Sequence, residues 1–333
     1  MKRREARAFW SLGNGEGELR KEALAPLKCN ELLIETHFSA ISRGTESLVF
    51  HGLVPESEWQ RMRAPFQRGD FGGSVKYGYA SVGRVIEGDA AWLGRSVFCL
   101  YPHQDYYIAP SEMVLSLPEA LPESRAVLAA NMETAINGVW DAAIAPGDRV
   151  TVIGGGVVGL LVAYLAGRIP GTEVTLSDIK PERADIARVL GVEFTLSQQA
   201  PSNNDVVIHC SGHPEGLMRA LELAGFEGRV IEMSWYGNQA VTLPLGEAFH
   251  SRRLTLRSSQ VGELDPSRKP RWNHRRRLAL ALSLLSDPVL DQLISGDCAF
   301  EALPMLMPQL TRAESDVLCQ RIRYSGAGDN RAL

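Results

Sequence analysis

The pattern of apolar and polar residues changes near residue 147 of the chain. Before this point, short apolar runs are separated by glycine and proline, which is typical of an irregular, mostly β domain. We expect strands in this part at residues 32–34, 80–86, 96–100 and 106–108. The first part of the chain is therefore predicted to consist of short strands and loops.

From residue 147 onward, short β-branched runs alternate with longer apolar segments. The runs predict strands at 149–153, 174–176, 205–209 and 229–233, and the segments predict helices at 157–168, 181–190 and 214–224. Strands that alternate with such helices form right-handed βαβ units around a parallel sheet. The predicted fold class is therefore α/β, with a doubly wound parallel sheet. The pattern ends near residue 260, and we expect a helix at 275–285 and a strand at 319–324 to return to the β domain.

Composition narrows the class of protein. The 333 residues correspond to about two domains, and 35 basic against 39 acidic side chains give a net charge of −4. No nucleic-acid partner is expected, because phosphate binding usually needs a basic domain. No membrane segment is expected either, since the longest apolar stretch, residues 157–167, is far shorter than the roughly 20 residues of a membrane helix. Five scattered cysteines and a start without a signal-peptide pattern indicate a reduced, cytoplasmic protein.

A glycine motif follows the first strand of the predicted parallel sheet. Gly154, Gly156 and Gly159 satisfy the G-x-G-x-x-G pattern between a strand and a helix. In a dinucleotide site the first glycine makes the tight turn, the second lets the pyrophosphate approach the backbone, and the third lets the helix pack on the strand. The phosphates then meet the positive end of the helix, to which we expect Val157 and Val158 to contribute.

An acidic residue stands at the end of the next predicted strand. Asp178 lies where a carboxylate accepts a hydrogen bond from the ribose 2′-hydroxyl and repels a 2′-phosphate. NAD is therefore favoured over NADP, although Lys180 and Arg183 are cations that would suit NADP. The remaining predicted cofactor contacts are Ile179, Lys180, Cys210 and Ser211. The alternative is a glycine-rich turn beside a surface aspartate, with no ligand.

Beside the glycine motif, four segments carry a resemblance to a known family: residues 33–46, 78–83, 133–140 and 207–212. Through them nearly the whole chain resembles the medium-chain dehydrogenase/reductase superfamily, the group of the zinc alcohol dehydrogenases. The resemblance implies a GroES-like β domain from residues 1–134 and 268–333, and a Rossmann domain at residues 135–267. It also implies an NAD(P)-dependent oxidoreductase that interconverts an alcohol and a carbonyl, a small-molecule substrate and a homodimer. A narrower resemblance, to bacteriochlorophyllide hydroxyethyl dehydrogenases, rests on residues 40–46.

Most zinc ligands of the family are missing at the matching positions. The ligand cysteine is replaced within Ser42–Arg43, the ligand histidine is replaced by Tyr79, and only the third position keeps an acid, Glu133. The four-cysteine structural zinc lobe of the family is missing as well. Because catalytic zinc normally needs three protein ligands, we expect chemistry without zinc. The alternative is a zinc-dependent dehydrogenase with an atypical site built from Glu46, His103 and Glu133.

Hydride transfer changes the charge on the substrate oxygen, so a side chain must give or take a proton there. Tyr79 is the first candidate, because it replaces a metal ligand and its phenol, with an ordinary pKa of about 10, can donate at neutral pH. Glu46, Glu133 and His103 are further candidates for proton transfer. Arg43 can bind a substrate carboxylate or pair with Glu46. Structural roles stay open for all of these residues, among them a packed aromatic at Tyr79 and an arginine partner at Glu133.

Two other functions stay open, an enone reductase and a non-catalytic protein that senses NAD(H). Loss of the metal ligands of the family is also what a non-catalytic sensing protein would show. The basic run at residues 268–277 is expected to be the solvated approach to the helix that follows it, with recognition of an acidic substrate or partner as the alternative.

Overall fold

The computed structural model describes residues 5–312 and 315–325 and divides into two compact units. The first unit comprises the chain up to Ala130 and again from Leu282 onward. The second unit is the continuous segment Asn131–Ala281. The chain therefore leaves the first unit, builds the second and then returns.

These boundaries differ from the predicted ones at residues 134/135 and 267/268. The larger difference concerns helix α7 (His274–Leu284), which follows the basic run. Arg277 on this helix binds Glu133 and Asn137 on helix α3 (Ala129–Ala142). The side chain of Arg277 is only 1% exposed, so the expectation of a solvated run is wrong for this residue.

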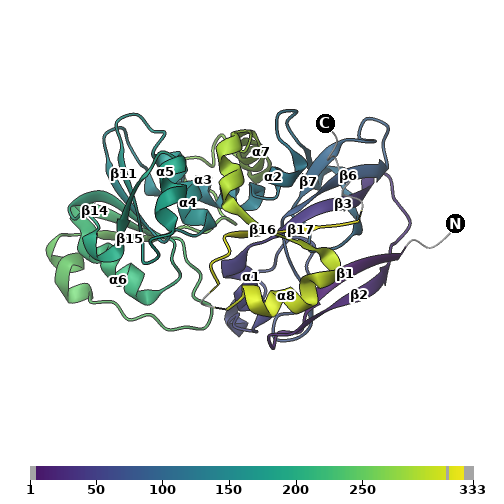
Figure 1. Cartoon of the computed structure of the whole chain (residues 1–333), viewed down its shortest axis with the longest axis horizontal. Coiled ribbons are helices and arrows are strands. Elements are labelled where there is room, and N and C mark those ends of the chain that lie inside the picture. Colours follow the sequence, from purple (N-terminus) through teal and green to yellow (C-terminus); the bar gives the residue numbers. More distant parts are fainter. Residues whose placement is uncertain (1–4, 313–314, 326–333) are drawn as a thin grey trace. The chain divides into compact units, whose positions relative to one another are not determined.

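A six-stranded parallel sheet with the order β12-β11-β10-β13-β14-β15 forms the centre of the second unit. Its strands are β10 (Arg149–Ile153), β11 (Glu173–Asp178), β12 (Glu193–Leu196), β13 (Asn204–His209), β14 (Ala224–Glu232) and β15 (Thr255–Ser258). Its other helices are α4 (Val157–Ala166), α5 (Arg183–Val189) and α6 (Pro214–Leu223). Figure 1 shows α4 and α5 on one side of this sheet and α6 on the other. Right-handed crossovers that leave the middle of a sheet in opposite directions produce this arrangement.

The central strands of this sheet are apolar because helices cover both faces. Val152 of β10 and Val206–Ile208 of β13 have no exposed surface. The outer strands are different, since Glu193 of β12 and Thr255 of β15 are exposed. Neither outer strand has a continuous apolar run, and the pattern analysis predicted neither of them.

The first unit contains a seven-stranded and a four-stranded sheet. The larger has the order β16-β17-β3-β6-β7-β9 with β8 also paired to β3, and the smaller has the order β2-β1-β5-β4. The strands of the larger sheet are β3 (Glu31–Ile41), β6 (Ser81–Glu87), β7 (Ser96–Cys99), β8 (Tyr106–Pro110), β9 (Val114–Ser116), β16 (Ile294–Ala299) and β17 (Cys319–Arg323). Those of the smaller sheet are β1 (Glu5–Ser11), β2 (Gly17–Ala23), β4 (Arg68–Gly69) and β5 (Val75–Lys76). The helices are α1 (Arg43–Phe50), α2 (Glu123–Ala126) and α8 (Leu303–Leu310).

The returning tail completes the first unit. Strand β17 pairs with β3 in antiparallel and with β16 in parallel orientation. Phe300 and Ile322 from the tail share one buried core with Phe9 and Phe50 from the start of the chain. Segments that are almost 300 residues apart in the sequence thus lie side by side, as Figure 1 shows for β17 and β3.

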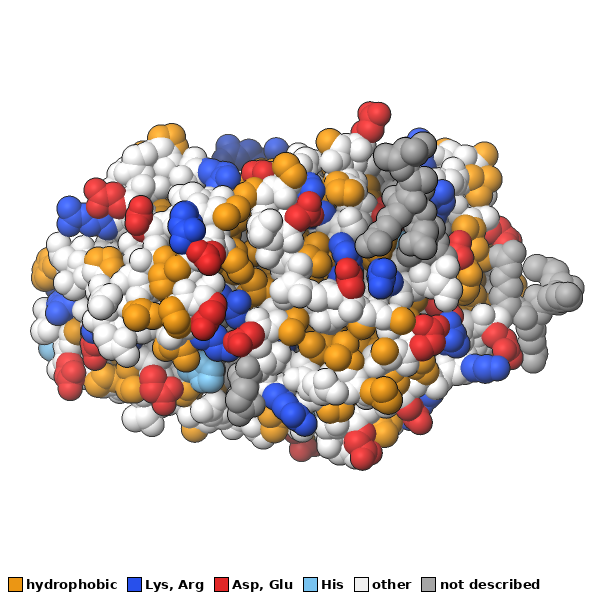
Figure 2. Space-filling view, in the orientation of Figure 1, with side chains coloured by type: hydrophobic (Ala, Val, Ile, Leu, Met, Phe, Trp, Pro, Cys, Tyr) orange, Lys and Arg blue, Asp and Glu red, His pale blue; other side chains and the backbone are white. Residues whose placement is uncertain are grey.

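The visible surface mixes both signs of charge. Figure 2 shows acidic and basic side chains interspersed on this face, and hydrophobic side chains gathered over α8, where Met305 is 77% exposed. Within the described ranges, the helices are too short or too polar for any of them to cross a membrane.

Candidate functional site

The glycine loop between β10 and α4 is tightly packed at its first and third glycines. Gly154 has a φ of +104°, and a Cβ there would lie 2.7 Å from the backbone nitrogen of Ser211. A Cβ on Gly159 would lie 1.9 Å from the carbonyl oxygen of Gly154. Both distances are shorter than real Cβ contacts, so the fold itself requires glycine at these two positions.

Gly156 differs, because the fold does not require glycine there. Its backbone is extended (φ −76°, ψ 179°), and a Cβ would meet no heavy atom within 4 Å. The open space lies at the N-terminus of α4, where Val157 and Val158 form the first turn without a side-chain cap among the described residues. Uncapped N–H groups and the helix dipole suit this end to a phosphate. The open space would let a ligand approach the backbone at this position.

Replacing Gly156 by valine tests this expectation. Because the position is open, we expect the free energy of unfolding to change by less than about 1 kcal/mol, as at an ordinary surface site. Affinity for a dinucleotide should fall roughly ten- to hundredfold, because hydrogen bonds to a charged phosphate are worth about 1.5–3 kcal/mol. Urea unfolding and a binding titration on the same preparation measure both quantities. Unchanged affinity would remove the loop from the binding site.

Asp178 ends β11 and faces the glycine loop. Its carboxylate accepts hydrogen bonds from the backbone N–H groups of Gly155 and Lys180. Ile179, which lies between Asp178 and Lys180 in the sequence, is 74% exposed. Arg183 of α5 packs against the loop, since a Cβ on Gly155 would lie 3.0 Å from its Cγ. The structure thus brings the residues predicted for the adenosine side beside the predicted phosphate site.

Cys210 and Ser211 lie on the other side of the loop, after β13. The backbone N–H of Cys210 donates to the carbonyl of Ile153 at 2.8 Å. Burial raises the pKa of the Cys210 thiol far above its usual range, so the thiol stays neutral. Ser211 Oγ lies 2.6 Å from Nε2 of His209. Sequence reasoning missed His209 and its partner Glu232, because parallel pairing joins them across 23 residues of sequence.

In the first unit, Tyr79 follows β5 and contacts α1. Its phenol hydrogen-bonds with the side chains of Ser42 and Thr45. Its ring meets that of Tyr77 edge-on, with 5.9 Å between the ring centres. Burial, helped by the negative charge of Glu46, raises the pKa of Tyr79 to about 12. The phenol therefore keeps its proton at neutral pH and is suited to donate it.

Glu46 and His103 form a buried pair near Tyr79. Nε2 of His103 lies 2.8 Å from Oε2 of Glu46, and Nδ1 lies 2.9 Å from the hydroxyl of Ser39. That hydroxyl in turn lies 2.9 Å from the hydroxyl of Tyr324. The chain of contacts fixes the imidazole ring, which then fixes the carboxylate.

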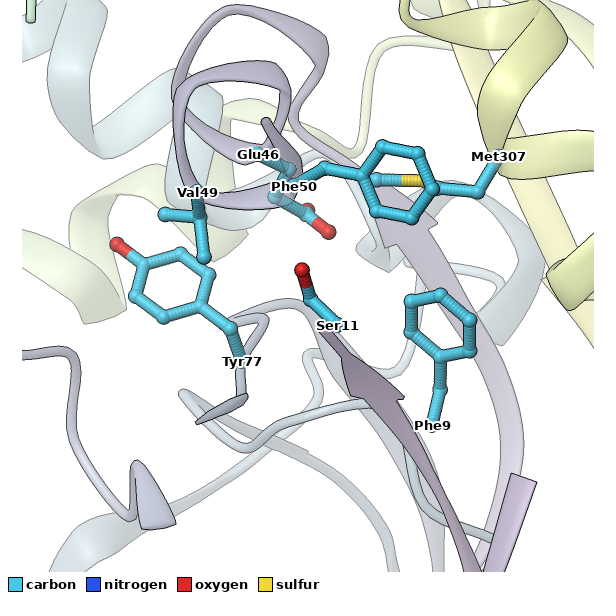
Figure 3. Close-up of a pocket in the computed structure, with 7 residues that line it drawn as sticks. All are labelled: Phe9, Ser11, Glu46, Val49, Phe50, Tyr77 and Met307. Atoms are coloured by element: carbon cyan, nitrogen blue, oxygen red, sulfur yellow. The ribbon is translucent and has the colours of Figure 1, made fainter. Parts of the chain in front are cut away.

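A small cavity opens beside the Glu46 carboxylate. Figure 3 shows this carboxylate and the Ser11 hydroxyl pointing toward each other, with the rings of Phe9, Phe50 and Tyr77 around them. The cavity volume is about 10 Å³, close to the least that one water molecule needs. The described cavity therefore has no room for an organic substrate.

Two other predicted candidates have structural partners. The Arg43 guanidinium donates to the backbone carbonyl of Ser315, and Glu46, its alternative partner, accepts from the backbone N–H of Ser42 at 2.8 Å. Glu133 accepts from Nε of Arg277 at 3.1 Å. Burial raises the pKa of Glu133, although the charge of Arg277 and its hydrogen bond act in the opposite direction.

The donor set does not fit zinc. Nowhere in the described ranges do three His, Cys, Asp or Glu side chains converge on a point that could hold a metal ion. Glu46 and His103 bind each other, and Glu133, which belongs to the second unit, is held by Arg277. Three protein donors around an open position, as catalytic zinc requires, are not assembled by these residues.

Comparisons with known proteins agree with this architecture. A family profile described as zinc-binding dehydrogenase matches residues 157–275. D-guloside 3-dehydrogenase from Escherichia coli (strain K12) is 26% identical over 277 residues, which are 74% of this chain and 79% of the relative.

Two solved structures share the fold over 96% of this chain and 99% of their own. A protein from Sinorhizobium meliloti 1021, bound to NADP, has a TM-score of 0.75 at 18% identity. The short chain alcohol dehydrogenase from E. coli CFT073, complexed with NADH, has a TM-score of 0.74 at 15% identity. The predicted combination of a GroES-like β domain and a Rossmann domain is confirmed.

Proposed function

We propose that this chain, which is similar to the medium-chain dehydrogenase/reductase superfamily, is an NAD-dependent oxidoreductase that interconverts an alcohol and a carbonyl without catalytic zinc. The open space at Gly156, which the fold leaves free and a pyrophosphate would fill, carries the cofactor part of the proposal. The buried phenol of Tyr79, at the position of a metal ligand in the family, carries the part that concerns zinc.

The second unit binds the cofactor in this proposal. The N-terminus of α4 holds the pyrophosphate through its backbone N–H groups. Asp178 accepts a hydrogen bond from the adenosine ribose and repels a 2′-phosphate. When bound there, the cofactor would supply a nicotinamide that can give a hydride to the substrate carbon or take one from it.

The first unit handles the proton. In the direction of reduction, Tyr79 donates its phenolic proton to the substrate oxygen as charge develops there. Glu46 helps to keep the phenol protonated, because its negative charge adds to the effect of burial that raises the pKa of Tyr79. His103 positions Glu46 through the 2.8 Å contact. In the direction of oxidation only the phenolate form of Tyr79 can accept the proton, and this form is rare at neutral pH because the pKa of Tyr79 is raised to about 12.

Cofactor choice follows from the charge of Asp178. We expect NADH to bind at least about tenfold more tightly than NADPH, because a carboxylate close to a 2′-phosphate adds an unfavourable charge pair. Fluorescence titration of the purified chain with each reduced cofactor measures this ratio. Asp178→Asn keeps a hydrogen-bond acceptor for the N–H group of Gly155 but loses the negative charge. The affinities for NADH and NADPH should therefore become more similar in this variant. Tighter binding of NADPH by the unmodified chain would contradict the preference.

The absence of catalytic zinc is tested independently. Elemental analysis after dialysis should find far less than one zinc per chain, and a strong chelator should leave the turnover unchanged. About one tightly held zinc per chain would overturn this part of the proposal and favour the atypical site.

Other expectations from the family resemblance stay predictions. They concern a homodimer, a cytoplasmic location and a small-molecule substrate without nucleic-acid or membrane partners. Analytical ultracentrifugation at micromolar concentration tests the first of them directly, because a dimer has twice the mass of 36.5 kDa.

A further inference from the structure

A polar cluster around the buried His209 stands at the carboxyl ends of β13 and β14. The last residues of the two strands, His209 and Glu232, are register partners, and Nδ1 of His209 lies 2.7 Å from Oε2 of Glu232. The Tyr236 ring stacks on the fully buried imidazole, and its hydroxyl donates to Glu232 at 2.8 Å. The backbone N–H of Ser234 donates to the second carboxylate oxygen at 2.6 Å.

Ser211 extends the hydrogen-bond network of this cluster. The Ser211 hydroxyl accepts from the backbone N–H of His213 at 3.2 Å and lies 2.6 Å from Nε2 of His209. Every hydrogen-bonding group is satisfied when Ser211 donates its own proton to Nε2 and the proton on Nδ1 faces Glu232. Although burial alone would raise it, hydrogen bonds from His209 and Ser234 lower the pKa of Glu232. The Glu232 carboxylate thus supplies the negative charge of the cluster.

No described cation offsets this charge through a direct contact with the cluster. Burial, Glu232 and Glu215 of α6 together raise the pKa of Tyr236, and none of them supplies a positive charge. Helix α6 also closes tightly over it, because a Cβ on Gly216 would lie 2.5 Å from Nε2 of His209. Holding an ion in such surroundings costs stability, which favours a functional reason for Glu232.

The position of the cluster relative to a dinucleotide follows from the sheet, and this step rests on the proposed function. The strand order reverses between β10 and β13, and dinucleotides lie across that point at the carboxyl ends of the strands. Asp178 on β11 marks the adenosine half, and α4 marks the pyrophosphate. The nicotinamide half therefore lies over the ends of β13 and β14, where Glu232 is.

We propose that Glu232, held by His209 and Tyr236, makes this chain prefer the oxidised cofactor. The nicotinamide ring is positively charged in NAD⁺ and neutral in NADH, so a fixed negative charge near it stabilises only the oxidised form. The surroundings of low dielectric strengthen the interaction.

Calorimetric titration with NAD⁺, NADH and ADP-ribose tests the proposal by binding alone. The unmodified chain should bind NAD⁺ at least as tightly as NADH. In Glu232→Gln, affinity for NAD⁺ should fall about three- to tenfold relative to NADH, as expected for one charge at roughly 10 Å. ADP-ribose, which lacks the nicotinamide, should bind within about twofold of the unmodified chain. Glu232→Asp keeps the charge and should keep the preference.

Glu222→Gln is the matched control, because it removes the same charge from an exposed pair with Arg219 on α6. It should leave the ratio of the two affinities unchanged. The proposal is overturned if Glu232→Gln still binds ADP-ribose and the ratio of its affinities for NAD⁺ and NADH is unchanged. Should that variant fail to fold, NADH binding more than tenfold tighter than NAD⁺ in the unmodified chain overturns it.

Failure of the proposed function gives a different result. Without binding of ADP-ribose or either dinucleotide, both proposals fall together. If the chain binds the phosphorylated cofactors more tightly, only the preference for NAD fails, and NADP⁺ and NADPH give the ratio instead.

Discussion

Replacing Tyr79 by phenylalanine is expected to lower turnover about 10²- to 10⁴-fold, the usual contribution of a positioned proton donor. Affinity for NADH should stay within about twofold, because the residues expected to bind the cofactor lie in the other unit of the fold. Steady-state kinetics with an accepted alcohol, together with a cofactor titration, separates the two effects. Turnover equal to that of the unmodified chain would remove Tyr79 from the mechanism.

Tyr77→Phe is a suitable control for this experiment. Tyr77 is buried and meets Tyr79 edge-on, so the change removes a hydroxyl from a neighbouring aromatic without touching the proposed donor. The pH profile gives a second check. Since burial raises the pKa of Tyr79 to about 12, the phenol stays protonated at every pH up to about 11. A change of the reduction rate between pH 6 and 9 must therefore come from another group.

Replacing Arg277 by leucine is expected to lower the free energy of unfolding by about 3–5 kcal/mol. Arg277 is 1% exposed. Its guanidinium donates hydrogen bonds to Glu133, to Asn137 and to the backbone carbonyls of Val261 and Glu263. Without it, the buried carboxylate of Glu133 loses its counter-ion. Urea unfolding followed by circular dichroism measures the loss. A change below about 1 kcal/mol would show that water reaches the carboxylate.

The pH dependence of this variant has a definite sign. Burial already raises the pKa of Glu133 in the folded chain, and loss of Arg277 should raise it further. A carboxyl whose pKa is raised by folding contributes stability at low pH that is lost as the pH rises through the folded pKa. The destabilisation by Arg277→Leu should therefore be smaller at pH 5 than at pH 8. Arg271→Ala, at an exposed position, is the control. It should change the free energy of unfolding by less than about 0.5 kcal/mol at both pH values.

The sequence pattern predicts the central part of the sheet because burial there is nearly complete. Strands β10 and β13 match the expected ranges within one residue, and α4 begins at Val157 as expected. The outer strands β12 and β15 escape prediction, because each has one covered edge and too few apolar residues for a pattern. Burial, rather than intrinsic propensity, decides which strands can be read from the chain.

In the candidate site, sequence could indicate the residues with local roles but not the long-range contacts. Gly154, Gly156 and Asp178 could be proposed as candidates because their predicted roles are local, within one strand–turn–helix segment and the strand after it. Long-range pairs could not. The contact of Arg277 with Glu133 joins positions 144 residues apart, and a basic run in the sequence contains no sign that one of its members is buried.

Completion of the first unit depends on the order in which the chain is made. The segment Phe38–Ile41 of β3 pairs with β17, which leaves the ribosome only after the whole second unit. At about 5–20 residues per second, this strand edge waits roughly a quarter of a minute to a minute for its partner. Unpaired edges of this kind attract other chains. During synthesis, the vulnerable species is therefore a chain whose second unit has all its strands while its first unit still lacks the last two, β16 and β17.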